Sequence, residues 1–207
     1  MKRYLAIILI LCCSQVLKSQ QTEITGKDKE ALVAEIEKAY RDVKTLSAAF
    51  TQEKSSSMLA EKVVQKGTLH YKAPAKMRWA YTSPEAMAIV FCDGKAVLQN
   101  KNGSSAPNKM VGELGSMIVN AVNGQFLKDN TSFSSSYYRQ TGSGDVTVKL
   151  KPLNKRMKLY YKEITLVLDK KDCLARKIVL AEASGDVTTI DFSDKKVNVQ
   201  ISDTLFK

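Results

Sequence analysis

Apolar and polar residues alternate with a period of two along most of this chain, a pattern typical of β-strands that bury one face. The alternation is clearest in residues 67–95, where Met77, Trp79 and Tyr81 share one strand face and Trp79 is the only tryptophan. Pro and Gly divide this stretch into short strands, and the Asp-Gly pair at 93–94 predicts a tight hairpin. Many short strands of this kind predict one large antiparallel sheet, curled or partly closed. The predicted strands cover residues 46–51, 63–64, 68–72, 77–81, 88–91, 95–98, 137–138, 146–150, 160–168, 178–181, 187–192 and 197–201.

Two segments change to the three- and four-residue spacing of an amphipathic helix. The first covers residues 28–43, and Thr25 is placed to cap it with its side-chain oxygen. The second covers residues 110–122 and is inserted between strands, with Asn108 as a candidate cap and Gly124 as a candidate end. Its apolar stripe carries two methionines and consists of Met110, Leu114, Met117, Ile118, Ala121 and Val122.

The N-terminus has the pattern of a secretory signal. Two basic residues precede the apolar run Tyr4–Cys13, which is too short to span a bilayer comfortably. We expect cleavage after Ser19, so that residues 1–19 are a signal peptide and Gln20 begins the mature protein. A lipoprotein signal is the rival interpretation, with Cys12 or Cys13 acylated, but the residues before each Cys are not the small pair that such processing favours.

Length and charge favour one exported domain. Residues 20–207 are enough for a single domain with a real core, and they contain no repeat and no Gly/Pro-rich linker, so we expect a monomeric single domain in the periplasm. Residues 1–19 contain three cations and no acid, so their removal lowers the formal net charge from +11 to +8. Anionic lipid surfaces or acidic partners suit this charge better than nucleic acid, because no basic run is interleaved with exposed aromatic residues. Cys92 and Cys173 remain, and an oxidising compartment allows them to pair, although their spacing forms no motif.

The sequence lacks the side-chain combinations that catalysis needs. Its one histidine, His70, lies in a strand between Leu69 and Tyr71 and faces away from both, as a solvent-side residue does. No Cys/His cluster has metal-ligand spacing, and no phosphate-binding loop or Gly-x-Ser-x-Gly turn is present. We therefore expect neither an enzyme nor a bound metal or cofactor.

The remaining candidates for function are apolar. Two interpretations stay open for them: an ordinary core, or the wall of a cavity for a greasy ligand. Methionine is flexible and suits surfaces that must repack, and a helix inserted over a curled sheet resembles a lid over an apolar ligand site. The candidate cavity residues are Phe50, Leu69, Tyr71, Met77, Trp79 and Tyr81 on one sheet face, and Met110, Leu114, Met117 and Ile118 on the helix.

Several ordered segments of the chain resemble the outer-membrane lipoprotein carrier protein (LolA) family. The resemblance extends over nearly the whole mature chain and begins with the first helix leading into Leu-Ser-Ala-Ala-Phe-Thr-Gln-Glu. Each segment alone is weak, but together they occur in the family's order. The matching segments are residues 46–53, 67–74, 77–81, Pro84, 93–95, 190–192, 197–198 and 203–206.

This resemblance implies an unclosed antiparallel β-barrel whose apolar cavity is covered by helices. It implies a carrier that takes acylated lipoproteins from an inner-membrane lipoprotein-releasing ABC transporter to an acceptor at the outer membrane, or to the membrane itself. Well-studied members keep an Arg before the Pro, thought to help hold the lid closed, where this chain has Ala73; Arg78 is a candidate substitute. The alternatives are a lipid- or protein-binding sensor on the same fold, and a lipid-anchored outer-membrane acceptor.

The two interpretations of the N-terminus predict different products. Cleavage after Ser19 predicts an exported protein that begins at Gln20 and takes up no labelled palmitate. Intact mass and radiolabelled palmitate incorporation in expressing cells measure both properties. Palmitate on Cys12 or Cys13 would contradict the soluble carrier and favour the anchored acceptor.

Overall fold

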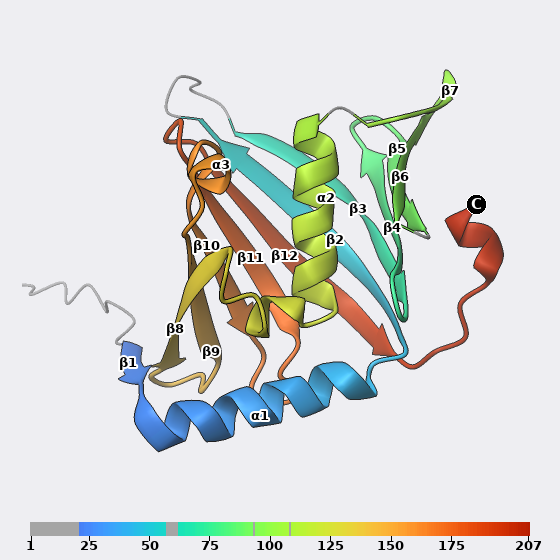
Figure 1. Ribbon diagram of the computed structural model, residues 1–207. Helices are drawn as coiled ribbons and strands as arrows, with labels where there is room; N and C mark the ends of the chain where they lie inside the picture. Colours follow the sequence, from blue (N-terminus) through green and yellow to red (C-terminus); the bar gives the residue numbers. More distant parts are fainter. Residues whose placement is uncertain (1–20, 57–61, 93, 108) are drawn as a thin grey trace, which may run out of the picture.

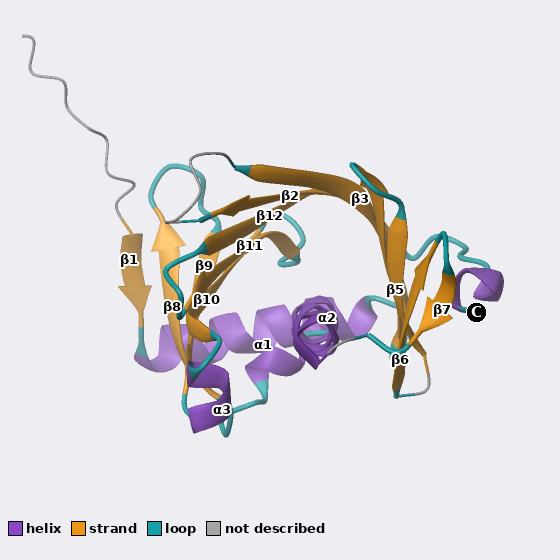
Figure 2. Ribbon diagram, turned by 90° about the horizontal axis from the view of Figure 1, so that it is seen from above, coloured by secondary structure: helices purple, strands orange, loops and turns teal. Residues whose placement is uncertain are grey.

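The chain forms one curved sheet with helices along one end and across its concave side (Figures 1 and 2). The structure is a computed structural model, and it describes residues 21–56, 62–92, 94–107 and 109–207. The predicted signal peptide therefore lies outside the described residues. Among these residues, twelve strands form the sheet. They are β1 (Gln21–Ile24), β2 (Thr45–Ser55), β3 (Val63–Lys72), β4 (Lys76–Ser83), β5 (Met87–Cys92), β6 (Lys95–Asn100), β7 (Gly103–Ser105), β8 (Phe133–Gln140), β9 (Val146–Pro152), β10 (Tyr161–Leu168), β11 (Ala175–Glu182) and β12 (Val187–Val197).

The sheet is antiparallel throughout and does not close. Its strand order is β1-β8-β9-β10-β11-β12-β2-β3-β4-β5-β6-β7, so β1 and β7 are edges that do not pair with each other. Most neighbours are joined by hairpins, while β12 returns to pair with β2, as Phe192 opposite Phe50 shows. Figure 2 shows the sheet bending around α2 (Lys109–Val122). The predicted fold class, an unclosed curled antiparallel sheet covered by helices, is confirmed.

Some element boundaries differ from the sequence pattern. The predicted strands 63–64 and 68–72 are one continuous strand, β3, because polar residues between them still pair with β2. The short edge strands β1 and β7 and the one-turn helix α3 (Lys155–Lys158) carry too few apolar residues to be predicted. The predicted last strand, residues 197–201, does not form, because β12 ends at Val197 and Ile201 is buried beyond it outside any strand.

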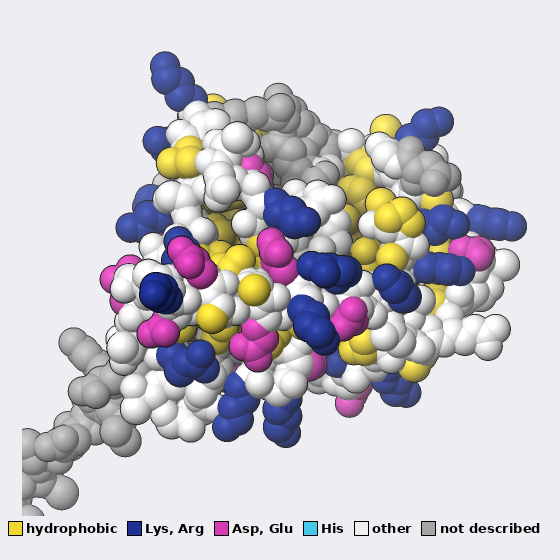
Figure 3. Space-filling model, turned by 60° about the horizontal axis from the view of Figure 1, so that its bottom comes forward, with side chains coloured by type: hydrophobic (Ala, Val, Ile, Leu, Met, Phe, Trp, Pro, Cys, Tyr) yellow, Lys and Arg dark blue, Asp and Glu magenta, His cyan; other side chains and the backbone are white. Residues whose placement is uncertain are grey.

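Helix α1 (Gly26–Asp42) crosses one end of the sheet, as Figure 1 shows. Its buried residues Leu32, Ile36 and Tyr40 recur every four residues, as one face of an amphipathic helix does. The predicted side-chain cap is wrong: Thr25 occupies the cap position, but its carbonyl rather than its side chain accepts a bond, from the Lys29 amide. On the outer surface of α1, basic and acidic side chains are interspersed (Figure 3).

Tyr40 fixes α1 to the sheet and to the end of α2. Its ring meets the Phe126 ring edge-on at a centroid distance of 5.8 Å, and its hydroxyl accepts a hydrogen bond from the Ala175 amide at 3.3 Å. Burial raises the pKa of Tyr40 well above its ordinary value. Gly124 ends α2 in the left-handed conformation as predicted, with φ of 75°, and lies so close to the Tyr40 ring that a Cβ there would clash. The short helix η1 (Gln125–Leu127) follows directly.

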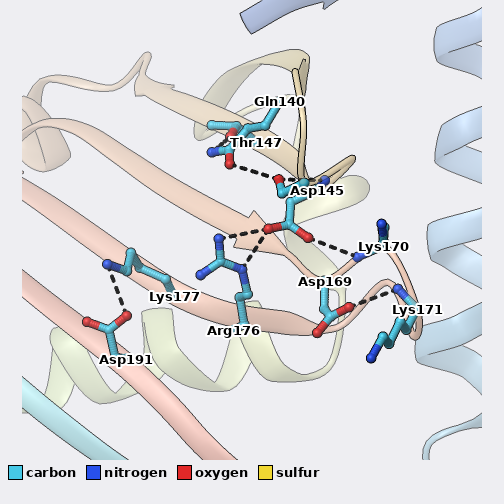
Figure 4. A network of polar contacts seen from close by, with 10 residues as sticks. Gln140, Asp145, Thr147, Asp169, Lys170, Lys171, Arg176, Lys177 and Asp191 are labelled. Atoms are coloured by element: carbon cyan, nitrogen blue, oxygen red, sulfur yellow. Dashed lines mark hydrogen bonds and ion pairs between the residues drawn. The ribbon is translucent and has the colours of Figure 1, made fainter. Parts of the chain in front are cut away.

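Asp145 ties together the turns at the end of the sheet near α1 (Figure 4). Its carboxylate accepts hydrogen bonds from Arg176 Nε at 2.9 Å and from the Lys170 amide at 3.3 Å. Burial on its own would raise the pKa of Asp145, but the Arg176 guanidinium and the amide hydrogen bond outweigh it and lower the pKa. The ion pair and the amide hydrogen bond therefore hold the β8–β9 and β10–β11 turns together beside α1 (Figure 1).

The C-terminal segment covers the outer, convex face of the sheet. Asp203, in the short helix η2 (Asp203–Phe206), pairs with Lys72 at 2.9 Å and Lys76 at 3.0 Å, and these lysines lower its pKa to about 2. Arg78 donates a hydrogen bond to the Leu205 carbonyl on the same face. The tail thus shields part of the sheet that the strand alternation alone would leave open to water.

His70 lies in the cross-strand row of Arg78 and Val90 on this outer face. It faces away from Leu69 and Tyr71 as predicted, but it is half-buried rather than on an open solvent side. Its Nδ1 makes no hydrogen bond to any described residue. Burial, with a smaller contribution from the positive charge of Arg78, lowers the pKa of His70 below its ordinary value.

This lowered pKa predicts an acid-sensitive stability. Below about pH 6.5 the unfolded chain binds a proton at His70 that the folded chain resists, so stability should fall as pH decreases from neutral towards pH 5. Replacing His70 by Gln removes the titrating group, and the variant should lose less stability over the same range. Urea unfolding midpoints at both pH values measure the difference. Equal acid losses in the wild type and His70→Gln would contradict the assignment.

Candidate functional site

Aromatic rings cover the centre of the concave face, which we call the inner face. Phe50 stacks on Trp79 with ring centroids 3.9 Å apart, and Tyr81 meets Phe50 edge-on at 5.4 Å. Phe192, opposite Phe50 on β12, meets Trp79 edge-on at 6.0 Å. Four rings from three strands therefore form one continuous apolar surface, since aromatic contacts of this geometry stabilise beyond the area they bury.

Gly67 makes room for this cluster. It lies opposite Phe50 in β2 and Tyr81 in β4, where a side chain of any size would point inward. A Cβ at this position would collide with the Ala80 carbonyl and the Phe50 ring. The absence of a side chain at residue 67 thus lets the Phe50 ring lie flat against the sheet and stack on Trp79.

The inner face becomes polar along β2, away from α1. The inward residues Leu46, Ala48 and Phe50 are followed at the same spacing by Gln52 and Lys54. Gln52 donates to Gln65 at 2.9 Å and accepts a hydrogen bond from the Tyr81 hydroxyl at 3.1 Å. Buried polar groups need partners of this kind, and these interactions provide them.

Lys54 forms the last inward group of β2 together with two carboxylates. Its ammonium group lies 3.0 Å from Glu182 and 3.3 Å from Asp186, and Thr188 donates a further hydrogen bond to Glu182. Burial on its own would lower the pKa of Lys54, but the two carboxylates outweigh it and raise the pKa. The inner face is thus apolar at the α1 end and charged at the opposite end.

Helix α2 lies across the apolar part of the inner face, as Figures 1 and 2 show. Gly115 lies directly against β5, because a Cβ there would overlap the ring of Phe91. One turn later Ile118, Ala121 and Val122 are buried against the sheet. Small residues at the crossing allow the helix backbone to approach the strand directly.

Two small apolar cavities remain beside α2. One has a volume of about 30 Å³ and lies between α2, η1 and strands β9 to β11; the other, of about 10 Å³, lies towards β2 and β3. The larger has room for about two water molecules, whereas sites for small molecules usually measure 300–1,000 Å³. The inner face is therefore closed in this conformation, and binding a long chain there requires α2 to move away from the sheet.

The structure divides the predicted cavity residues into three groups. Ile118 lines the larger cavity and Leu69 the smaller one. Five residues lie in the buried core of the inner face and line neither cavity, namely Phe50, Tyr71, Met77, Trp79 and Tyr81. Three predicted helix residues have side chains outside the described part of the structure, namely Met110, Leu114 and Met117.

Sequence reasoning missed the other half of the cavity wall. The larger cavity is bordered mainly by aliphatic side chains from β9, β10 and β11, opposite the aromatic cluster. Their alternation was visible in the sequence, but nothing in it indicated that these strands meet α2. The missed lining residues are Ala121, Phe126, Phe133, Leu150, Ile164, Leu166, Ile178 and Leu180, with Asn120 and Asp129 as polar members.

Arg78 cannot replace the family's Arg before the Pro, which is Ala73 here. It lies on the outer face, where it donates hydrogen bonds to Gln99 at 2.7 Å and to Leu205, so the sheet separates it from α2.

Within the described part of the chain, Cys92 and Cys173 are not joined by a disulfide. No group of three or more His, Cys, Asp or Glu residues able to hold a metal occurs there. Nor does any helix among these residues combine the length and apolar character needed to cross a membrane.

Comparison with known sequences connects this architecture to a protein family. The sequence profile described as "Outer membrane lipoprotein carrier protein LolA" matches residues 41–207. A relative from Methylococcus capsulatus, named "Outer-membrane lipoprotein carrier protein", is 26% identical over 208 residues, covering 99% of this chain and 92% of the relative.

Solved structures share the fold at low sequence identity. A DUF1329 family protein from Desulfovibrio piger superposes with a TM-score of 0.51 at 9% identity, over 86% of this chain and 96% of the other. MucB superposes with a TM-score of 0.53 at 12% identity, over 88% of this chain and 63% of MucB. At these identities the likeness shows the fold alone.

The contact between Gly115 and Phe91 predicts opposite effects for two similar substitutions in α2. Gly115→Ala should destabilise the protein by about 1–3 kcal/mol, because the new methyl group displaces the Phe91 ring. Gly112→Ala is the matched control: among the described side chains its methyl group would meet Pro107 alone, at 3.9 Å, so it should stabilise α2 by about 0.5–1 kcal/mol. Chemical denaturation measures both changes. Two Ala variants of equal stability would contradict the close contact.

Proposed function

Because this chain belongs to the outer membrane lipoprotein carrier protein family, we propose that it binds lipoprotein acyl chains between α2 and the inner face. In this proposal it is a periplasmic chaperone that receives acylated lipoproteins from an inner-membrane ABC transporter. It then passes them to an acceptor at the outer membrane or to the membrane itself. The observation that carries the proposal is the apolar inner face with α2 laid across it and small cavities on both sides of the helix.

The free energy of acyl transfer explains why such a protein needs a sheath. Withdrawing one methylene group from water lowers the free energy by about 0.8 kcal/mol. Moving a whole lipid anchor through water without cover is therefore strongly unfavourable. A curved apolar sheet under a helix can enclose such a chain. Because the sequence contains no nucleotide-binding motif, the energy for extracting the anchor has to come from the partner that delivers it.

Movement of α2 is the step that opens the site in this proposal. The helix is anchored at its C-terminal end, where Gly124 and Phe126 pack against Tyr40. The left-handed Gly124 separates α2 from η1, so it is the natural pivot. An acyl chain entering beside Ile118 would then replace the contact between Gly115 and Phe91 with contacts of its own.

The polar end of the inner face suits the other part of the cargo. A lipoprotein anchor joins apolar chains to a polar protein segment, and the inner face has both kinds of surface in sequence along β2. The chains would lie over Phe50 and Trp79, while the polar segment would leave past Lys54 and Glu182. This orientation keeps the charged groups near water.

Uptake of an acyl probe tests the proposal. Trp79 lies in the inner wall, so a fluorescent fatty acid bound there should shift the emission of Trp79, the only tryptophan, and Trp79→Ala should weaken binding. Because that variant also leaves a cavity, a second one keeps the wall intact: Ala121→Leu should fill the space beside α2 and reduce uptake, and a cooperative thermal transition shows that the variant still folds. Ala106→Leu, at an exposed position just before α2, is the matched control and should bind as the wild type does.

Mass spectrometry of protein purified from the periplasm should find a co-purifying lipoprotein or lipid. A compact protein that takes up no acyl probe would contradict the carrier and favour the sensor alternative. Equal uptake by Ala121→Leu and Ala106→Leu would place the bound chain somewhere other than beside α2.

A further inference from the structure

The end of the sheet opposite α1 carries an exposed segment of one charge sign. Residues 151–162 include five cations and no acid. Lys151, Lys155, Lys158 and Lys162 are exposed, and none of the ion pairs among the described residues involves them. We call this segment the basic rim; it contains α3 and the chain on both sides of it (Figure 1).

Two leucines of the basic rim point into solvent. Leu159 is 74% exposed, the most exposed of the large apolar residues in the described part of the chain, and Leu153 is 46% exposed. Their neighbours Met157 and Tyr160 pack against the core instead. The segment therefore packs some of its apolar residues against the core, while the two leucines stay at the surface among lysines.

The basic rim is held in place by hydrogen bonds at both ends. The Leu153 amide donates to the Ser132 carbonyl at 2.8 Å, and the Tyr160 carbonyl accepts from the Ala183 amide at 2.8 Å. Between them, the Asn154 side chain caps α3 by accepting from the Met157 amide at 2.8 Å. The exposure of Leu159 is thus a fixed feature of a bonded turn, rather than the result of a loose loop.

We propose that the basic rim docks this protein on the surface of an anionic phospholipid bilayer. The lysines contact the phosphate headgroups, and Leu159 and Leu153 enter the interface between headgroups and acyl chains. Clusters of cations beside exposed apolar side chains are the combination that binds such surfaces, because electrostatic attraction and apolar burial add. An acidic protein partner would match the lysines but would leave two protruding leucines to be accommodated.

The face along α1 does not share this character. Along α1 at the opposite end, Lys27 and Lys29 alternate with Asp28 and Glu30 in the sequence, and both signs are interspersed across that face (Figure 3). A mixed surface has no net attraction for an anionic bilayer. The basic rim is therefore the end that would face the membrane.

Docking in this orientation would bring the polar end of the inner face towards the bilayer. The hydrogen bond from Ala183 to Tyr160 joins the basic rim to the β11–β12 turn, which holds Glu182 and Asp186 beside Lys54. Acyl chains would then pass between membrane and inner face at the end where the polar groups lie. This last step rests on the proposed function, whereas the docking itself does not.

Vesicle co-sedimentation tests the docking with protein purified from the periplasm, so that the cell has processed the N-terminus. The wild type should bind vesicles of phosphatidylcholine mixed with phosphatidylglycerol, bind vesicles of phosphatidylcholine alone far less, and release as salt rises. The double variant Lys155→Glu/Lys158→Glu should bind at least about tenfold more weakly. Leu159→Ser should also weaken binding, by roughly tenfold.

The matched control changes the same number of charges elsewhere. Lys27 and Lys171 are exposed at the α1 end, so Lys27→Glu/Lys171→Glu has the same net charge as the rim variant and should keep vesicle binding near the wild-type level. Equal losses in both double variants, equal binding to neutral vesicles, or no binding at all would overturn the docking. Acyl-probe uptake by each variant separates the two proposals: uptake without vesicle binding removes the docking alone, and vesicle binding without uptake removes the carrier alone.

Discussion

An unclosed sheet with an apolar concave face has to be covered, and the rest of this structure follows from how that cover is made. A closed barrel would bury its interior by pairing its edges, but here β1 and β7 stay apart. Helix α2 supplies the missing wall, and Gly115 allows it to come close to Phe91. Burying the inner face this way requires no covalent link, so the cover can in principle be displaced by another apolar chain of sufficient area.

This arrangement balances enclosure against release. Cavities of about 30 and 10 Å³ show that the closed form is nearly filled by its own side chains. A bound acyl chain therefore competes with α2 for the inner face. Its net free energy of binding is only the difference between its own contacts with that face and the contacts of α2 that it replaces. Since each methylene contributes about 0.8 kcal/mol, a site that bound a lipid anchor without such competition would hold it too tightly to pass it on. The polar groups around Lys54 end the apolar surface on one side, so a bound lipoprotein would have its polar segment oriented towards them.

The sequence alone predicted the inner face and the helix across it, but not the strands opposite the aromatic cluster or the tail on the outer face. Alternation in β4 placed Met77, Trp79 and Tyr81 on one buried surface, because side chains in a strand must alternate whatever lies above them. It could not reveal that Leu166 and Leu180 face the same space, since that depends on how the sheet bends. The tail over Arg78 was equally hidden, because long-range contacts of Leu205 leave no periodic signal. Strand periodicity predicts which face of the sheet a residue occupies, but it does not predict which other elements contact that face.

The central claim is that acyl chains bind between α2 and the inner face, and the most direct measurement places a bound chain there. A fatty acid carrying a nitroxide near its terminal methyl group can be added to protein with isotope-labelled Ile, Leu and Val methyl groups. The account predicts strong paramagnetic broadening of the Ile118, Leu69 and Leu166 signals, with clearly weaker broadening of Val90 and Ile201 on the outer face. Equal broadening on both faces, or none at saturating fatty acid, would contradict it.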